Sequence, residues 1–142
     1  MTNINFHRHA RHYGYTESGW QKAIADYAQF RSQSLRSTDE REKVDMQIKA
    51  AFALASSYMI ERALMRAGVI PSTPEEQTGF KLDIMYGCPD DRKPREFEGK
   101  YYICKHIPLL RHPSTVEVLF WDRLWICIGD ADDEMPGAYV HA

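Results

Sequence analysis

Three histidines stand within six residues near the N-terminus, in the segment HRHARHYGY. Neutral imidazole is a good ligand for zinc, copper or nickel. In an extended segment His7 and His9 would point the same way, whereas a helix would separate them. A structural zinc site commonly has four ligands, and no cysteine lies nearby in the sequence. His7, His9 and His12 are therefore candidate metal ligands in an incomplete set, and the sequence predicts no cofactor.

The same segment offers a second chemistry, contact with nucleic acid. Arg8 and Arg11 could bind phosphates while Tyr13 and Tyr15 stack on bases. Two arginines make a small basic patch, however, and the whole chain carries a net charge of −2. Nucleic acid is thus the minor alternative, and residues 1–15 are interpreted as a mobile N-terminal arm or a short edge strand.

Cysteine chemistry is the next candidate. Cys104 and His106 would share a face of a strand, which allows a thiol–imidazole contact. Neither a glycine elbow nor a helix start follows Cys104 to stabilise an oxyanion, so a small core residue is the expected role. Cys127 is interpreted in the same way, and Cys88 in its turn is expected to be the exposed thiol. Three widely spaced cysteines do not indicate a disulfide framework.

Four carboxylates follow the last apolar segment, namely Asp130, Asp132, Asp133 and Glu134. Carboxylates at a strand end can hold magnesium or calcium, but the spacing does not match a calcium-binding loop. We expect a solvated acidic turn, with a negative patch for a basic partner as the alternative.

The segment VEVLFWDRLWICIG has apolar residues at both parities of a strand. A sheet with one solvated face would not need them. Either both faces are covered, by the N-terminal helix and arm, or one face carries an aromatic patch for a partner. Trp and Arg are favoured anchors of protein interfaces. Trp121, Arg123 and Trp125, with the acidic residues that follow them, are therefore the predicted partner-binding residues.

No phosphate-binding glycine loop, G-x-S-x-G, H-E-x-x-H or paired C-x-x-C occurs. Small size and the lack of these motifs favour a non-enzymatic protein-interaction module over an enzyme. Such a module could be an inhibitor or an immunity-type protein that binds and blocks another protein, and a homo-oligomer is a further expectation. The alternative is a metal- or nucleic-acid-binding protein that uses the N-terminal His, Arg and Tyr residues.

Two helices are expected in the first half of the chain. The first is capped by Thr16 or Ser18 and is followed by a loop over residues 31–38. The pattern S-x-x-E at Ser37 predicts the start of a long helix that ends at Ala67, before Gly68. Small residues fill several sides of its middle, which predicts that this helix is largely buried.

Strands are expected in the second half. A short helical turn at Thr73 should end at Gly79, followed by strands at residues 80–86, 100–107 and 115–129. Asp122-Arg123 could divide the last strand into a hairpin, and a single bulged strand is the alternative. The predicted fold is α+β, with two N-terminal helices packed on a C-terminal antiparallel sheet of three or four strands.

The amino-acid composition is that of an ordinary globular domain. A chain of 142 residues with 44% hydrophobic and 27% charged residues fits one domain. No apolar run reaches the roughly 20 residues that span a bilayer, and no secretory signal is recognised at the N-terminus. We therefore expect a cytoplasmic protein without membrane contact. Residues 1–36 carry a charge balance of +3 and residues 112–142 one of −5.

Overall fold

A computed structural model describes the backbone of residues 4–131 and the side chains from residue 9 to residue 131. The chain divides into two compact units. The helical unit comprises Met1–Pro71 with Pro108–Trp121, and the sheet unit comprises Ser72–Ile107 with Asp122–Ala142. Each of the two long strands contributes residues to both units, so each unit is considered by itself.

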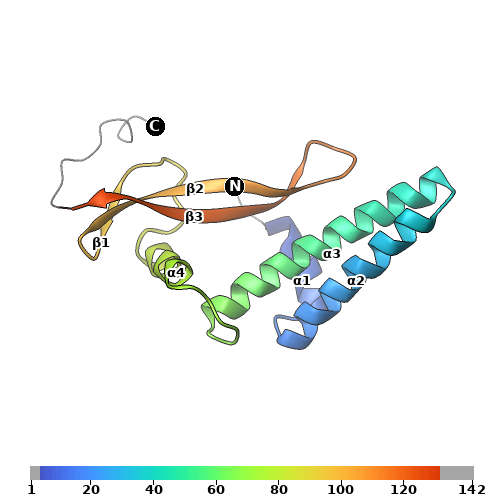
Figure 1. Ribbon diagram of the computed structural model, residues 1–142, viewed down its shortest axis with the longest axis horizontal. Coiled ribbons are helices and arrows are strands. Elements are labelled where there is room, and N and C mark those ends of the chain that lie inside the picture. Colours follow the sequence, from blue (N-terminus) through green and yellow to red (C-terminus); the bar gives the residue numbers. More distant parts are fainter. Residues whose placement is uncertain (1–3, 132–142) are drawn as a thin grey trace. The chain divides into compact units, whose positions relative to one another are not determined.

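Four helices precede three strands (Figure 1). The elements are α1 (Ile4–Tyr13), α2 (Glu17–Arg36), α3 (Glu40–Arg66), α4 (Pro74–Tyr86), β1 (Arg95–Phe97), β2 (Lys100–Arg111) and β3 (Val118–Asp130). The α+β class, the long second helix of the predicted pair and an antiparallel sheet of three strands confirm the predicted fold class.

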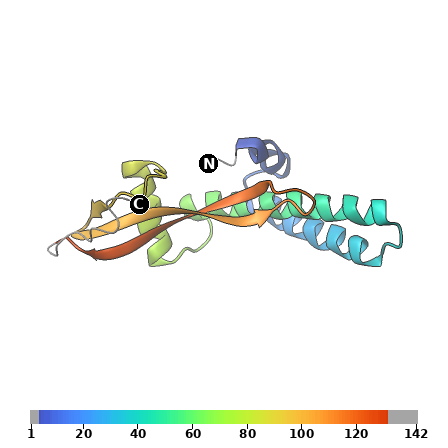
Figure 2. The same cartoon turned by 90° about the horizontal axis from the view of Figure 1, so that it is seen from above.

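The N-terminal segment differs from the prediction of an arm or an edge strand, because residues 4–13 form the helix α1. Its contacts are with α3 and α2 (Figures 1 and 2). Ala10 is fully buried in the resulting core. A helical signal was present in the sequence, since Phe6, Ala10 and Tyr13 recur at the i, i+4, i+7 spacing of one helix face, but the polar residues between them led to the prediction of an arm.

The start of α2 follows the prediction, since the Thr16 side chain accepts a hydrogen bond from the Gly19 N–H at 3.0 Å. The helix then continues to Arg36, through most of the segment expected to be a loop. The N-cap of α3 also differs from the prediction, because it is Asp39 and not Ser37. Asp39 accepts from the Arg41 N–H at 3.1 Å and caps α3, whereas Ser37 bonds to the backbone of Asp39 in the connection.

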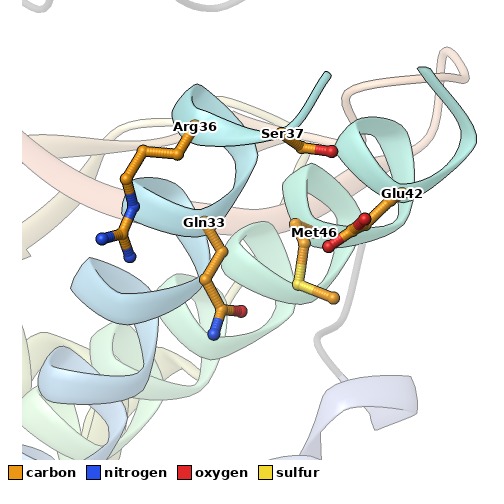
Figure 3. A pocket seen from close by; sticks show the side chains of 5 residues that line it. All are labelled: Gln33, Arg36, Ser37, Glu42 and Met46. Atoms are coloured by element: carbon orange, nitrogen blue, oxygen red, sulfur yellow. The ribbon is translucent and has the colours of Figure 1, made fainter. Parts of the chain in front are cut away.

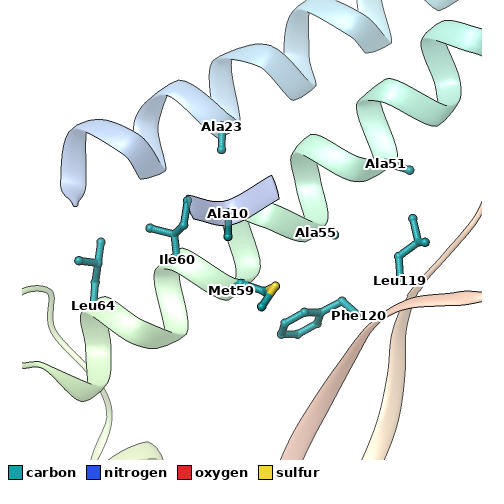
Figure 4. Packing of buried hydrophobic residues seen from close by; sticks show 9 residues of the cluster. All are labelled: Ala10, Ala23, Ala51, Ala55, Met59, Ile60, Leu64, Leu119 and Phe120. Atoms are coloured by element: carbon teal, nitrogen blue, oxygen red, sulfur yellow. The ribbon is translucent and has the colours of Figure 1, made fainter. Parts of the chain in front are cut away.

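The middle of α3 is buried, as its small residues predict. Its side chains form one cluster with α1, α2 and the adjacent ends of the strands (Figure 4). The buried members of this cluster are Ala10, Ala23, Ala51, Ala55, Met59, Ile60, Leu64, Leu119 and Phe120. Ser56 and Ser57 are also buried, and each donates its hydroxyl to a backbone carbonyl of the preceding turn. The first turns of α3 are more exposed, because they lie beyond this cluster.

The helical unit ends in the connection between β2 and β3. The His112 N–H donates to the Glu117 carbonyl at 2.8 Å and closes this turn. The rings of Tyr58 and Phe120 lie 5.3 Å apart, centroid to centroid, which adds an aromatic pair to the burial of Phe120 against α3.

In the sheet unit, the predicted strand at residues 80–86 is wrong, because this segment belongs to α4. Thr73 and Glu76 form a reciprocal capping box that starts the helix, and the helix passes through Gly79. A glycine inside a helix costs about 1 kcal/mol relative to alanine, which a strong cap and side-chain packing can offset. Alternation of apolar residues was therefore a misleading signal here.

The sheet has the order β1-β2-β3. β1 pairs antiparallel with β2 in the register Arg95↔Tyr102, and it lies between the predicted strands at residues 80–86 and 100–107, where no strand was predicted. Glu98 and Gly99, which both have positive φ, form the two-residue turn between these strands. β3 runs without interruption through Asp122 and Arg123, so the predicted hairpin at this pair is wrong and the single strand is right. Among residues 4–131, no helix is long and apolar enough to span a membrane.

Candidate functional site

The best-defined group of predicted site residues lies where β3 meets α4 in the sheet unit. Asp83 of α4 accepts hydrogen bonds from the Arg123 Nε at 2.6 Å and from the Trp125 Nε1 at 2.7 Å. The Arg123 Nη2 donates to the second Asp83 oxygen, which makes the ion pair bidentate. The side chains of Arg123 and Asp83 are 20% and 13% exposed. Two of the predicted partner-binding residues thus have an internal partner.

Helical spacing explains why α4 can make this contact. Gly79, Leu82, Asp83 and Tyr86 stand at positions i, i+3, i+4 and i+7, which share one helix face. Leu82 is fully buried, and the rings of Tyr86 and Trp125 lie 6.3 Å apart. A Cβ placed on Gly79 would lie 3.7 Å from the Trp125 ring, so this position brings α4 close to the indole.

Asp83 also determines the protonation of its partner. Burial lowers the pKa of Arg123, but the hydrogen bonds and charge of Asp83 raise it by more, so that the net shift is upward. The guanidinium therefore stays charged and bound to the carboxylate. This arrangement resembles a structural clamp more than a catalytic pair, because both charges are already neutralised by each other.

The remaining predicted residues on β3 differ in their exposure to solvent. Trp121 is partly buried, and Asp130 is exposed at the end of the strand. Asp132, Asp133 and Glu134 lie outside the described residues. The predicted partner-binding set is therefore described at Trp121, Arg123, Trp125 and Asp130 only.

The opposite face of β3 was not singled out from the sequence. Successive side chains of a strand alternate between faces. Because Arg123 and Trp125 point to α4, Leu124 and Ile126 lie on the other face. Leu124 is 43% exposed, the largest exposure among the large apolar side chains of β3. The apolar residues on both faces of the predicted strand did indicate this second face. The sequence analysis chose the face with Trp121 and Trp125 because tryptophan is a favoured interface residue.

The predicted site residues of the N-terminal segment lie on α1 or directly after it, and some of them pack against the core of the helical unit. The Tyr13 hydroxyl donates to Asp26 Oδ2 at 2.9 Å, and burial together with this bond raises the pKa of Tyr13 to about 12. Burial also raises the pKa of Tyr15. Both rings are half-buried and pack against the core of the helical unit. Arg11 is exposed, and the Arg8 side chain lies outside the described residues.

The histidines of the segment have aromatic neighbours. His9 stacks on Phe52 with ring centroids 5.3 Å apart, and the Phe52 ring meets His112 edge-on at 6.0 Å. His12 lies edge-on to Tyr13. The His7 side chain is outside the described part of the chain. Among the side chains of residues 9–131, no group of three or more His, Cys, Asp or Glu residues could hold a metal ion.

The cysteines follow the prediction in two of three cases. Cys104 is 1% exposed, and burial raises the pKa of its thiol to about 11, which suits a core residue. Cys88 is exposed, as predicted, but Cys127 is exposed as well. The expectation that Cys127 is a core residue is therefore wrong.

A hollow of about 350 Å³ lies beside the connection between α2 and α3 (Figure 3). Its lining comes from the end of α2 and the first turns of α3, and consists of Gln33, Arg36, Ser37, Glu42 and Met46. The two charged groups have opposite sign and the side chains are largely solvated. This hollow was not anticipated from the sequence, and it has no concentration of chemistry that would make it an active site.

The chain matches no family model, no curated protein and no solved structure.

Proposed function

We propose that this protein is a non-enzymatic protein-interaction module, and that it binds a polypeptide by adding a strand to β3. The supporting observation is that β3 is the last strand of the sheet order. Within residues 4–131 it has a ladder on one side only, the side of β2. An unpaired strand edge presents a row of N–H and C=O groups that another extended chain can satisfy.

The two sides of the sheet differ in a way that supports this choice. The outer side of β2 is partly covered by β1, and beyond it β2 carries Lys105, Pro108 and Arg111. Lysine and proline are the residues that protect strand edges from unwanted pairing. β3 is 13 residues long and has no lysine or proline. Its arginine, Arg123, is bound to Asp83.

Side chains on β3 provide specificity in this proposal. A partner strand would place alternate side chains beside the exposed Leu124 and its neighbour Ile126. The exposed carboxylate of Asp130 lies at the end of the same strand. Arg123 and Trp125 act indirectly, because their bonds to Asp83 fix α4 on one face and keep β3 extended.

More specifically, we propose that the protein is an inhibitor or an immunity-type protein that binds and blocks another protein. It is supported by the length of 142 residues and by the lack of recognised catalytic motifs in the sequence. A protein of this type would occupy a partner's surface and would need no chemistry of its own. Among the described side chains of α1, from His9 to Tyr13, no group favours the metal- or nucleic-acid-binding alternative.

The experiment compares lysine substitutions at two exposed apolar residues of the sheet unit, Leu124 and Ile84. Leu124→Lys places a charge on the face of β3 opposite to α4, beside the unpaired edge, and Ile84→Lys places one on α4, where the side chain is 86% exposed. Each tagged variant and the parent protein are used to capture partners from the native host. We expect Leu124→Lys to lose a partner that both the parent and Ile84→Lys retain.

Hydrogen exchange then tests the binding mode. In the complex, β3 amides that point away from β2 should exchange at least about tenfold more slowly, because a new ladder protects them. A partner that is retained by folded Leu124→Lys, or that leaves β3 exchange unchanged, would contradict binding through this edge.

A further inference from the structure

We draw no further inference here: the strongest candidate, the edge of β3 that is unpaired within residues 4–131 and lies beside the exposed Leu124, carries nothing beyond the proposed function, because nothing in the structure shows what covers it.

Discussion

At the scale of single residues, Asp83 is the centre of the sheet unit. Its carboxylate accepts from two side chains on alternate positions of β3, Arg123 and Trp125. Alternate positions lie on one face, so a single helix residue can reach both. The result is that a charged and an aromatic residue, which resemble interface anchors in the sequence, instead attach α4 to the strand.

Asp83→Asn should therefore destabilise the protein more than an ordinary surface substitution. The change leaves a partly buried Arg123 without its opposite charge, which we expect to lower the free energy of unfolding by about 2 kcal/mol. Urea unfolding monitored by tryptophan fluorescence measures this. The control is Asp45→Asn, because the exposed pair of Asp45 with Lys49 should be worth less than about 0.5 kcal/mol. Equal effects of the two substitutions would contradict the role of Asp83.

The three thiols should also differ in reactivity. Cys88 and Cys127 are exposed, whereas Cys104 is buried and its thiol has a pKa raised to about 11. The thiolate is the reactive form, so Cys104 is protected both by access and by protonation. At pH 8, a disulfide reagent such as dithionitrobenzoate should label two thiols quickly and the third only in denaturant. Rapid labelling of all three would disagree with the packing of β2.

At the scale of elements, two glycines inside helices have opposite surroundings. A Cβ on Gly19 of α2 would lie 2.1 Å from the Gly14 carbonyl oxygen and 2.5 Å from that of Tyr13. These are backbone atoms that cannot move aside cheaply. A Cβ on Gly79 of α4 would make an ordinary contact with Trp125 at 3.7 Å. The same substitution should thus have different signs in the two helices.

Gly79→Ala should raise the free energy of unfolding by about 0.5–1 kcal/mol, because alanine has the higher helix propensity. Gly19→Ala should lower it by about 1–3 kcal/mol, since overpacking against backbone outweighs that gain. Denaturant midpoints of both variants and the parent protein measure the two changes. A stabilising Gly19→Ala would mean that α2 does not begin this close to the end of α1.

These helices also show how far the sequence could predict the elements. The long buried α3 was predictable because many small residues and a terminal glycine gave several agreeing signals. α4 was not, since its apolar residues alternate and Gly79 interrupts it, while the capping box at Thr73 supports only the first turn. The open edge of β3 depends on strand order, and nothing in a local pattern reports which strands are neighbours.

At the scale of the whole molecule, the two units carry opposite charge. The sequence places eleven Lys and Arg against eight Asp and Glu in the helical unit, a balance of +3. The sheet unit has seven against twelve, a balance of −5. Two sheet units brought together would repel each other, whereas a basic partner would be attracted. Charge should therefore favour a basic partner for the sheet unit over an acidic one.

Salt dependence should distinguish these partners. Added salt screens charges separated by more than about 10 Å at 0.1 M ionic strength. A basic partner of the sheet unit should bind about two- to fivefold more weakly in about 0.5 M than in about 0.05 M sodium chloride, as attraction is screened. Analytical ultracentrifugation at several salt concentrations measures this change. A contact that strengthens over the same range would contradict attraction between the sheet unit and a basic partner.

Stability at alkaline pH depends on two acidic side chains with raised pKa values, Tyr13 in the helical unit and Cys104 in the sheet unit. The folded-state pKa values are about 12 for Tyr13 and about 11 for Cys104, against reference values of 10.0 and 9.0. Because both values are raised, the folded state keeps its protons while the unfolded state loses them. Stability should be constant below pH 9 and then fall as the pH rises toward 12.

By pH 11 Tyr13 should contribute a loss of about 1 kcal/mol and the more deeply buried Cys104 a loss of about 2 kcal/mol. Urea midpoints at pH 8, 9, 10 and 11 measure the slope. Tyr13→Phe and Cys104→Val remove one titrating group each, so each should flatten the decline even if it lowers stability at pH 8. The fall should begin one pH unit later in Cys104→Val, when only Tyr13 remains, because the phenol of the unfolded chain ionises above the thiol. An identical slope in both variants and the parent protein would show that neither group is protected in the folded state.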